Sequence, residues 1–88
     1  LAKCTIYPAR VIEACAPQIA RKARMQVGFD ADIVAFDLAA LADKADFADM
    51  AQPSEGVRHL LVGGAPVIAD GVLNTDARNG TAIRRTPK

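Results

Sequence analysis

The sequence predicts a small, mainly β domain with one or two short helices. Two apolar runs at 57–62 and 65–69 flank a Gly-Gly pair, and a third run at 33–36 is rich in β-favouring residues. The 88 residues leave room for one small domain, which by area scaling buries only about 60–65% of the surface that its unfolded chain exposes. Apolar residues make up 51%, but many are Ala, with three Phe, one Tyr and no Trp. We therefore expect the core to be thin and to gain from a partner surface.

The first 24 residues are predicted to form a helical segment. Thr5 can cap a helix, and Pro8 fits a first helical turn, where its missing N–H costs nothing. A short helix is expected around Pro8–Cys15, and Pro17 then ends or kinks it. The basic stretch 18–24 suits either a second helical turn or a connector.

Residues 25–88 are predicted to form the β domain, beginning with a short strand at 25–27 and a turn at Gly28. The side chains of Asp30 and Asp32 are expected to bond back to the local backbone in this turn. A strand near 33–37 follows. Because its apolar run is continuous, we expect it to be buried on both faces.

A helix is predicted over Leu38–Met50, with Asp37 as its cap, because Leu38, Leu41, Ala45 and Ala48 share a face. The Ala content inflates the helix propensity of this stretch, and a loop is the alternative. The stretch 52–56, which includes Pro53 and Gly56, is predicted to be a loop.

The clearest prediction is the β-hairpin of strands 57–62 and 65–69. Gly63 and Gly64 tolerate the positive φ angles that a two-residue hairpin turn requires. Asp70-Gly71 is a second turn signal before a short strand at 72–73, so we expect a three-strand meander. A last short strand is expected at Ala82-Ile83.

The charge balance argues against partners that bind through electrostatics. The chain holds 11 Lys and Arg against 10 Asp and Glu, for a net charge of +1. Its basic residues also lack interleaved aromatic side chains that would stack on bases. We therefore expect neither a nucleic-acid nor a membrane partner.

The two cysteines, Cys4 and Cys15, match neither a zinc pattern nor a CxxC redox motif. Free thiols in a reducing cytoplasm are the favoured interpretation, and a single disulfide closing a short loop is the alternative.

No apolar run reaches the ~18 residues of a membrane span. The chain begins at Leu1 without a recognisable signal peptide, so we expect a cytoplasmic protein that belongs to something longer.

Candidate catalytic groups are scarce. His59 is the only histidine, whereas a zinc site needs three or four ligands. A triad could be drawn from Ser54, His59 and an aspartate, but no nucleophile-elbow motif is present. We therefore predict no catalytic and no metal-binding residue in this chain. The residues singled out as structural turns are Gly28, Asp30, Asp32, Gly56, Gly63, Gly64, Asp70 and Gly71.

The order of several motifs resembles a known family. The motifs are Thr5-x-x-Pro8-Ala9, Gln26-Val27-Gly28-x-Asp30-Ala31-Asp32-Ile33-Val34-x-Phe36-Asp37, Pro53-Ser54-Glu55-Gly56-Val57, Leu61-Val62-x-Gly64-x-Pro66-Val67 and Asp70-Gly71. From Thr5 to Arg85 the chain resembles the C-terminal end of amidohydrolase-superfamily enzymes. Within these it is most similar to the N-acyl-D-amino-acid deacylase (D-aminoacylase) type.

This resemblance implies a non-catalytic portion of a larger hydrolase. The parent enzyme would combine a metal-bearing (β/α)8 barrel with a small β-sandwich, a composite domain built from both chain ends. Residues 1–24 would pack on the absent barrel, and the rest would supply the C-terminal share of the sandwich. Zinc or a similar divalent metal would act on the barrel in amide hydrolysis. No His-x-His pair exists here, so the chain alone is predicted to be inactive.

Three positions depart from the family pattern. Ala23 stands where a Gly is usual, Gly63 where Asn is common, and Asn79 where a Pro often precedes Gly80. A Gly at position 63 still allows the positive φ angle that the hairpin turn requires. Ala23 would lose easy access to positive φ if the family's Gly uses it.

Two alternatives stay open. The chain could be a free-standing β-rich binding or interaction module that recruits a partner by strand addition. The parent could also be a dihydroorotase-like, hydantoinase-like or deacetylase-like amidohydrolase. The expected partners are the missing barrel and N-terminal strands, with a homodimer through exposed strand edges as a further possibility.

Overall fold

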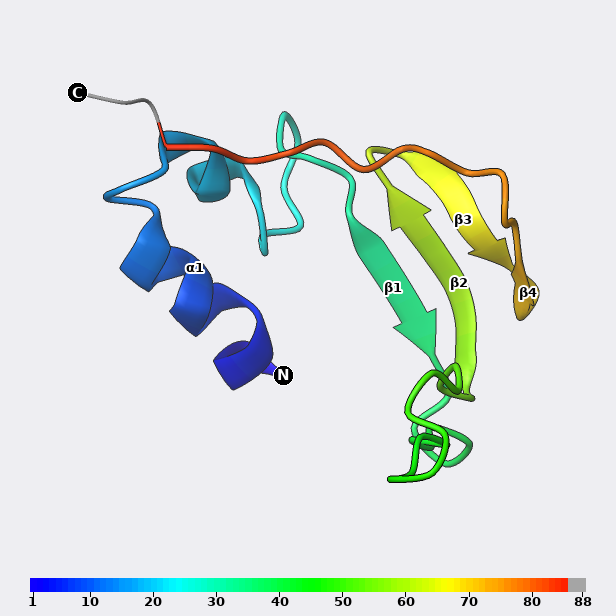
Figure 1. Cartoon of the computed structure of the whole chain (residues 1–88). Coiled ribbons are helices and arrows are strands. Elements are labelled where there is room, and N and C mark those ends of the chain that lie inside the picture. Colours follow the sequence, from blue (N-terminus) through cyan, green and yellow to red (C-terminus); the bar gives the residue numbers. More distant parts are fainter. Residues whose placement is uncertain (86–88) are drawn as a thin grey trace.

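The structure of the chain, a computed structural model, describes residues 1–85. It contains one short α-helix and a four-stranded antiparallel sheet with the strand order β1-β2-β3-β4 (Figure 1). The elements are η1 (Ala2–Cys4), α1 (Ile6–Ile12), η2 (Pro17–Arg21), β1 (Ile33–Phe36), β2 (Val57–Val62), β3 (Ala65–Ala69) and β4 (Val72–Leu73). A small mixed α/β fold results, in agreement with the mainly β prediction. Residues 86–88, the end of the predicted 25–88 domain, lie outside the described part.

The hairpin of β2 and β3 has the predicted two-residue turn. Gly63 and Gly64 both adopt positive φ, at 59° and 81°, and Val62 pairs with Ala65 across the turn. Two positive φ angles define the turn type whose twist matches the flanking strands. The turn between β3 and β4 repeats this geometry at Asp70 (φ 50°) and Gly71 (φ 78°).

Strand β1 extends the predicted three-strand meander to four strands. It pairs with β2 from Ile33↔Leu61 to Phe36↔Val57, with an irregularity between Ala35 and Phe36. The expectation that it is buried on both faces is wrong, because the Val34 side chain is 50% exposed. As the first strand of the sheet, β1 also has one unpaired edge.

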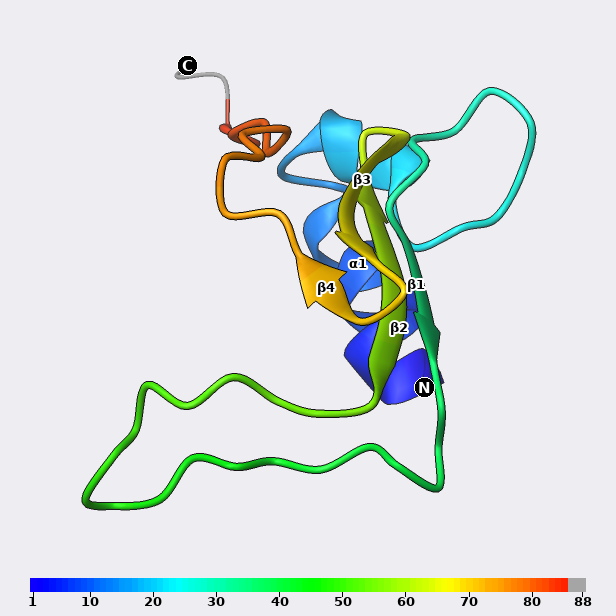
Figure 2. The ribbon, with the colours of Figure 1, turned by 90° about the vertical axis from the view of Figure 1, so that its right-hand side faces the viewer.

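The predicted helix over Leu38–Met50 is absent, and residues 37–56 instead form a projecting loop, which we call the arm (Figure 2). The arm leaves the sheet at Asp37, whose N–H donates to the Gly56 carbonyl, and an isolated bridge joins Ala42 to Glu55. Aspartate carboxylates accept hydrogen bonds from N–H groups two residues later, and the donor–acceptor pairs are Ala39–Asp37, Ala45–Asp43, Ala48–Asp46 and Ala51–Asp49. Such local bonds compete with helical ones, which explains the failed prediction.

The N-terminal segment is helical but shorter than predicted. Helix α1 runs from Ile6 to Ile12 rather than over Pro8–Cys15, and η2 provides the second helical turn after Pro17. The predicted side-chain cap is wrong. The Thr5 hydroxyl donates a hydrogen bond to the Leu1 carbonyl, at the start of η1, and accepts none from the first N–H groups of α1.

Two predicted strands are missing. Met25–Val27 is irregular and turns back at Gln26, whose carbonyl accepts the Phe29 N–H, and the Val27 side chain is fully exposed. Ala82-Ile83 is likewise irregular. In both places the β-favouring residues have no neighbouring strand with which to pair, and a strand needs a partner for its backbone groups.

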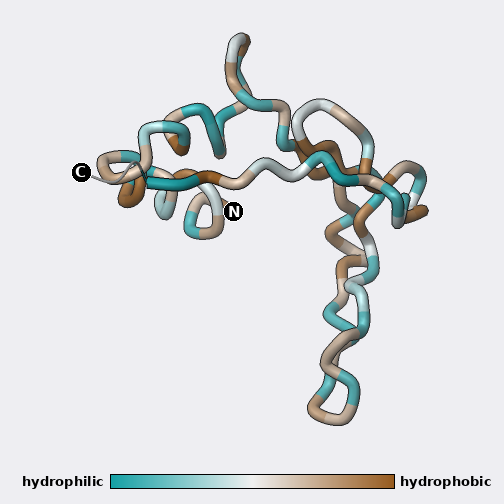
Figure 3. The backbone as a smooth tube through the Cα atoms, turned by 45° about the horizontal axis from the view of Figure 1, so that its top comes forward, coloured by the Kyte–Doolittle hydropathy of each residue, from teal (hydrophilic) through white to brown (hydrophobic). Residues whose placement is uncertain are grey.

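Little of the molecule forms a core. Among the described residues only Ala9 and Ala16 are buried. Strongly hydrophobic residues gather along the strands of the sheet (Figure 3). The accessible surface is 7193 Å², about 2,000 Å² more than area scaling gives for a compact 9.3 kDa monomer. The radius of gyration is 15.0 Å, against about 12 Å for a compact chain of this length. The fold is therefore open, with apolar surface left for something else to cover.

None of the helices in the described part is long and apolar enough to cross a membrane.

Candidate functional site

An ionic junction joins the helical segment to the sheet. Lys22, just after η2, forms ion pairs with Asp30 (3.0 Å) and with Asp32, and Arg21 forms a second pair with Asp30 at 3.2 Å. Lys22 is half-buried, so its aliphatic stem also fills space in the junction. The helical elements contact one another and the strands contact one another, so this junction is a main link between the two parts.

Asp32 carries the longest-range contact of the junction. One carboxylate oxygen accepts the Gly63 N–H at 2.8 Å, and the other faces Lys22. The Lys22 ammonium, followed by the Gly63 N–H, lowers the pKa of Asp32 below its ordinary value. The hydrogen bonds to Asp32 and Asp30 raise the pKa of Lys22. The two aspartates were predicted to bond to the local backbone, and that prediction is wrong for both. The Asp30 carboxylate pairs with the Arg21 and Lys22 side chains, and the backbone partner of Asp32 lies 31 positions away.

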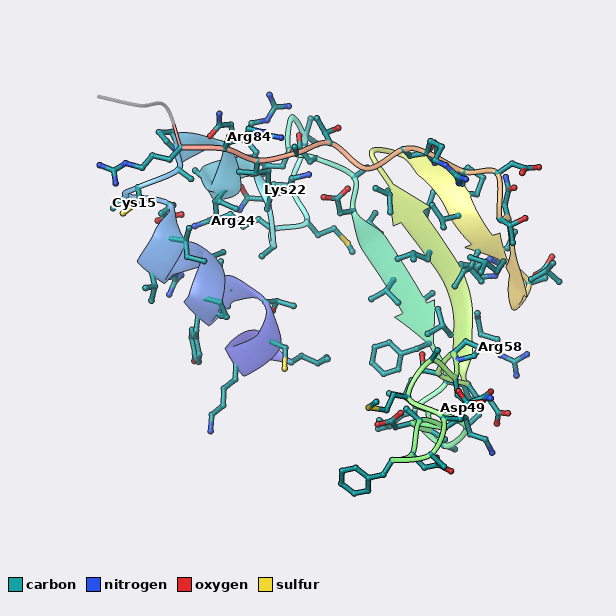
Figure 4. The ribbon with its side chains drawn as sticks, viewed as in Figure 1. Cys15, Lys22, Arg24, Asp49, Arg58 and Arg84 are labelled. Carbon is teal, nitrogen blue, oxygen red and sulfur yellow. The ribbon has the colours of Figure 1, made fainter. Side chains whose placement is uncertain are left out.

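Arg24 holds the chain between η2 and the turn at Gly28. Its guanidinium forms an ion pair with Glu13 at 2.7 Å and donates to the Ala20 and Lys22 carbonyls at 2.9 and 3.2 Å (Figure 4). Within this tight path Ala23 adopts φ 58°, the left-handed region that favours glycine. The sequence departure at Ala23 thus falls on a residue that does need positive φ.

Two shallow grooves flank the junction. One, of about 290 Å³, lies between the Ala23–Gln26 stretch and the start of β1 and is lined also by Phe29 and Thr5. The other, of about 320 Å³, lies between Lys22, Gly63 and the C-terminal stretch that contains Asn79 and Ile83. Because the charges at the second groove are already paired with each other, it offers no free charge to a ligand.

The glycine turns differ in how closely they are packed. At Gly56 (φ 90°) a side-chain β-carbon would lie 2.6 Å from the backbone of Leu41, inside the base of the arm. At Gly28 (φ 86°) and Gly71 (φ 78°) no atom lies within 4 Å of that position. Gly56 is therefore required both by its backbone angle and by close packing, whereas the other two are required by angle alone.

No catalytic arrangement forms among the described residues. His59 lies beside Asp70, whose backbone N–H donates to the imidazole Nδ1 at 3.3 Å and whose carboxylate is 3.6 Å from Nε2. Ser54 lies in the exposed base of the arm. Within the described part no three His, Cys, Asp or Glu side chains gather to hold a metal ion, and Cys4 and Cys15 are exposed free thiols.

What the chain offers instead is exposed apolar surface. At the tip of the arm the Phe47 side chain is 101% exposed and that of Met50 is 78% exposed, and together with Ala45 and Asp46 they line a notch of about 240 Å³. On α1, Val11 is 77% exposed and Tyr7 54% exposed. Sequence reasoning missed both surfaces, because it placed the arm in a helix and the α1 face against a barrel.

Comparison with known proteins adds no relative: no protein-family model, no curated protein and no solved structure matches this chain. The amidohydrolase resemblance therefore depends on the order of the motifs alone.

Proposed function

We propose that this chain is the non-catalytic C-terminal portion of a metal-dependent amidohydrolase that hydrolyses non-peptide amide bonds, those of N-acyl-D-amino acids. The observation that carries the proposal is the lack of a core: in the part of the chain that the structure describes, only two alanines are buried, while about 2,000 Å² of surface is exposed beyond that of a compact monomer. A segment that normally packs on a barrel and completes a sandwich with other strands would leave such surface uncovered.

The arrangement of the apolar surface supports the same proposal. Helix α1 exposes Val11 and Tyr7, as expected of a helix lying on a barrel, and β1 presents an unpaired strand edge, as expected of a sheet completed by strands from elsewhere. The motifs that resemble the family fall on the turns that position these surfaces, at Gly28, Gly56 and Gly63-Gly64. Zinc or a similar metal, and the ligands for it, would belong to the barrel.

A chimera tests this proposal. The C-terminal segment of a D-aminoacylase would be replaced by these 88 residues, and hydrolysis of N-acetyl-D-amino acids would be measured with zinc present. We expect the chimera to recover most of the activity that the truncated barrel loses, while the 88-residue chain alone has none. Gly71→Ala and Gly56→Ala chimeras form a matched pair: the first should keep activity, and the second should lose it because the added β-carbon would clash with the Leu41 backbone at the base of the arm.

An inactive but folded chimera would contradict the proposal for the D-aminoacylase type. Activity recovered only on a dihydroorotase-like, hydantoinase-like or deacetylase-like barrel would point to that parent instead.

The second candidate is a free-standing β-rich module that binds an extended peptide at β1, which the unpaired edge of that strand favours. Calorimetry of the isolated chain separates the two. A part of a larger enzyme should unfold weakly and without cooperativity, whereas a self-sufficient module should show one sharp transition.

A further inference from the structure

The charges of this chain are strongly separated along the fold. Residues 1–24 hold five basic residues against Glu13, a net charge of +4, and the arm (37–56) holds five acidic residues against Lys44, a net charge of −4. Figure 4 shows the two at different ends of the molecule, with Lys22 and Arg24 on the helical segment and Asp49 on the arm.

Each charged end also carries an exposed apolar surface. The arm tip consists of Asp43, Asp46, Phe47, Asp49 and Met50, all exposed. The α1 face consists of Lys3 in η1 and of Tyr7, Arg10 and Val11 in α1, all exposed. Arg10 and Val11 follow Tyr7 by three and four residues, so these three lie on the same side of α1.

The charges of these two surfaces are not neutralised within the described residues. Lys3 and Arg10 form no ion pair there, and neither do Asp43, Asp46 and Asp49, although the ion pairs of Arg21, Lys22 and Arg24 are all satisfied internally. Asp43 and Asp46 accept backbone N–H groups on one carboxylate oxygen each, and Asp49 accepts one backbone N–H and the Gln52 side-chain amide. Each carboxylate oxygen has two lone pairs, so acceptor capacity for an external cation is left on all three. The acidic arm tip and the basic α1 face are therefore complementary in charge, and both are apolar at their centres.

We propose that two copies of this chain form a two-fold dimer in which the arm tip of each copy docks on the α1 face of the other. Two-fold symmetry repeats the contact, so that each copy gives one arm and receives one. Phe47 and Met50 would pack on Tyr7 and Val11, while the tip aspartates pair with Lys3 and Arg10.

The whole open fold exposes more surface than a dimer of standard size buries. A stable interface of standard size buries about 800 Å² on each partner, and each copy exposes about 2,000 Å² beyond a compact monomer. This inference goes beyond the proposed function, because it concerns association of the chain with itself. A barrel would cover the same α1 face, so the dimer is a property of the chain that is not docked on a barrel.

Sedimentation equilibrium of the 88-residue chain tests the proposal directly. We expect a dimer at low ionic strength whose dissociation constant rises at least roughly tenfold between 0.01 and 0.5 M NaCl, because salt screens the paired charges. A monomer at all concentrations and salt levels would overturn the proposal.

A charge swap provides the sharper test. An arm variant (Asp46→Lys with Asp49→Lys) and a helix variant (Lys3→Glu with Arg10→Glu) should each be monomeric, because like charges then meet. Mixed in equal amounts, they should form a one-to-one heterodimer, since both contacts are again between opposite charges. Recovery in the mixture also shows that neither variant merely failed to fold. If each variant still dimerises alone, the proposal is wrong.

Two controls separate this contact from pairing of strand edges. Val34→Lys places a charge on the edge strand β1 and should leave the dimer unchanged; loss of the dimer in this variant alone would assign it to β1 edges instead. Phe47→Ser should weaken the dimer roughly tenfold through lost apolar burial, whereas Leu38→Ser, at an exposed position at the base of the arm, should not. The activity of the chimera is a separate measurement, so either proposal can fail without the other.

Discussion

The carboxylate of Asp32 accepts a hydrogen bond from the backbone N–H of Gly63 at 2.8 Å, across 31 positions of sequence. This contact fixes the turn of the central hairpin against the start of β1, and through Lys22 it fixes both to the end of the helical segment.

Replacing Asp32 with Asn should therefore loosen this junction. The amide keeps an acceptor for the Gly63 N–H but loses the ion pair with Lys22, so we expect a loss of about 1 kcal/mol in stability. Amide hydrogen exchange at Gly63 measures the effect locally. Asp76→Asn is the matched control, because Asp76 is exposed and lies outside the junction. Equal protection of Gly63 in the two variants would contradict the role given to Asp32.

Stability should depend on pH through the same pair. The lowered pKa of Asp32 means that its contribution is present above the ordinary aspartate pKa of about 3.9 and is lost as pH falls through the folded value. The raised pKa of Lys22 means that its contribution is present below about pH 10.4 and is lost as pH rises through the folded value.

The thermal midpoint from circular dichroism should accordingly be level from about pH 5 to about pH 9 and fall on both sides. In the Asp32→Asn variant the acid fall should be shallower. A midpoint that rises between pH 5 and pH 3 would show that the pair does not stabilise the fold.

Ala23→Gly should stabilise the protein. Ala23 has φ 58°, which costs an L-residue about 1–2 kcal/mol, while glycine adds some freedom to the unfolded chain. The expected net gain is about 0.5–1 kcal/mol, read as a higher urea midpoint. Ala20→Gly, three residues earlier in η2, is the control and should lower the midpoint, since Ala20 is not among the residues with positive φ. A lower midpoint for Ala23→Gly would refute the strain at this residue.

Gly56→Ala should be much more damaging than Gly71→Ala. Both residues have positive φ, so each substitution strains the backbone by about 1 kcal/mol. At Gly56 the added β-carbon would also lie 2.6 Å from the Leu41 backbone, whereas at Gly71 nothing lies within 4 Å. We expect a total loss of about 2–4 kcal/mol at Gly56 in thermal unfolding. Similar losses in both variants would mean that the base of the arm is not closed around Gly56.

The features that could be predicted from the sequence are those set by local chemistry. Gly63-Gly64 between two apolar runs specifies a tight hairpin, and Asp70-Gly71 specifies the next turn in the same way, because few other residues accept two positive φ angles in succession. A mainly β fold followed from these turns and from the apolar run of β1.

The features that could not be predicted depend on competition between local and helical hydrogen bonds, or on contacts between residues far apart in the sequence. Leu38–Met50 has the composition of a helix, but its aspartates recur every three to six residues and bond to the backbone two residues on, which favours a chain of turns. Met25–Val27 has the residues of a strand but no pairing strand among residues 1–85. The partner of Asp32 could not be found locally, since Gly63 is brought to it only when the sheet forms.

Because of the arm, the strands of the sheet should not all pair at the same time. The hairpin of β2 and β3 closes through two residues, whereas β1 must reach β2 across the 20 residues of 37–56. Loop closure over the longer distance costs about 2 kcal/mol more in chain entropy, so the hairpin should nucleate within microseconds and β1 should join later. During that interval the free side of β2 is open to any other strand nearby, and the local concentration of such strands decides which one pairs with it. Until β1 has paired, β2 can therefore pair with a strand of another chain.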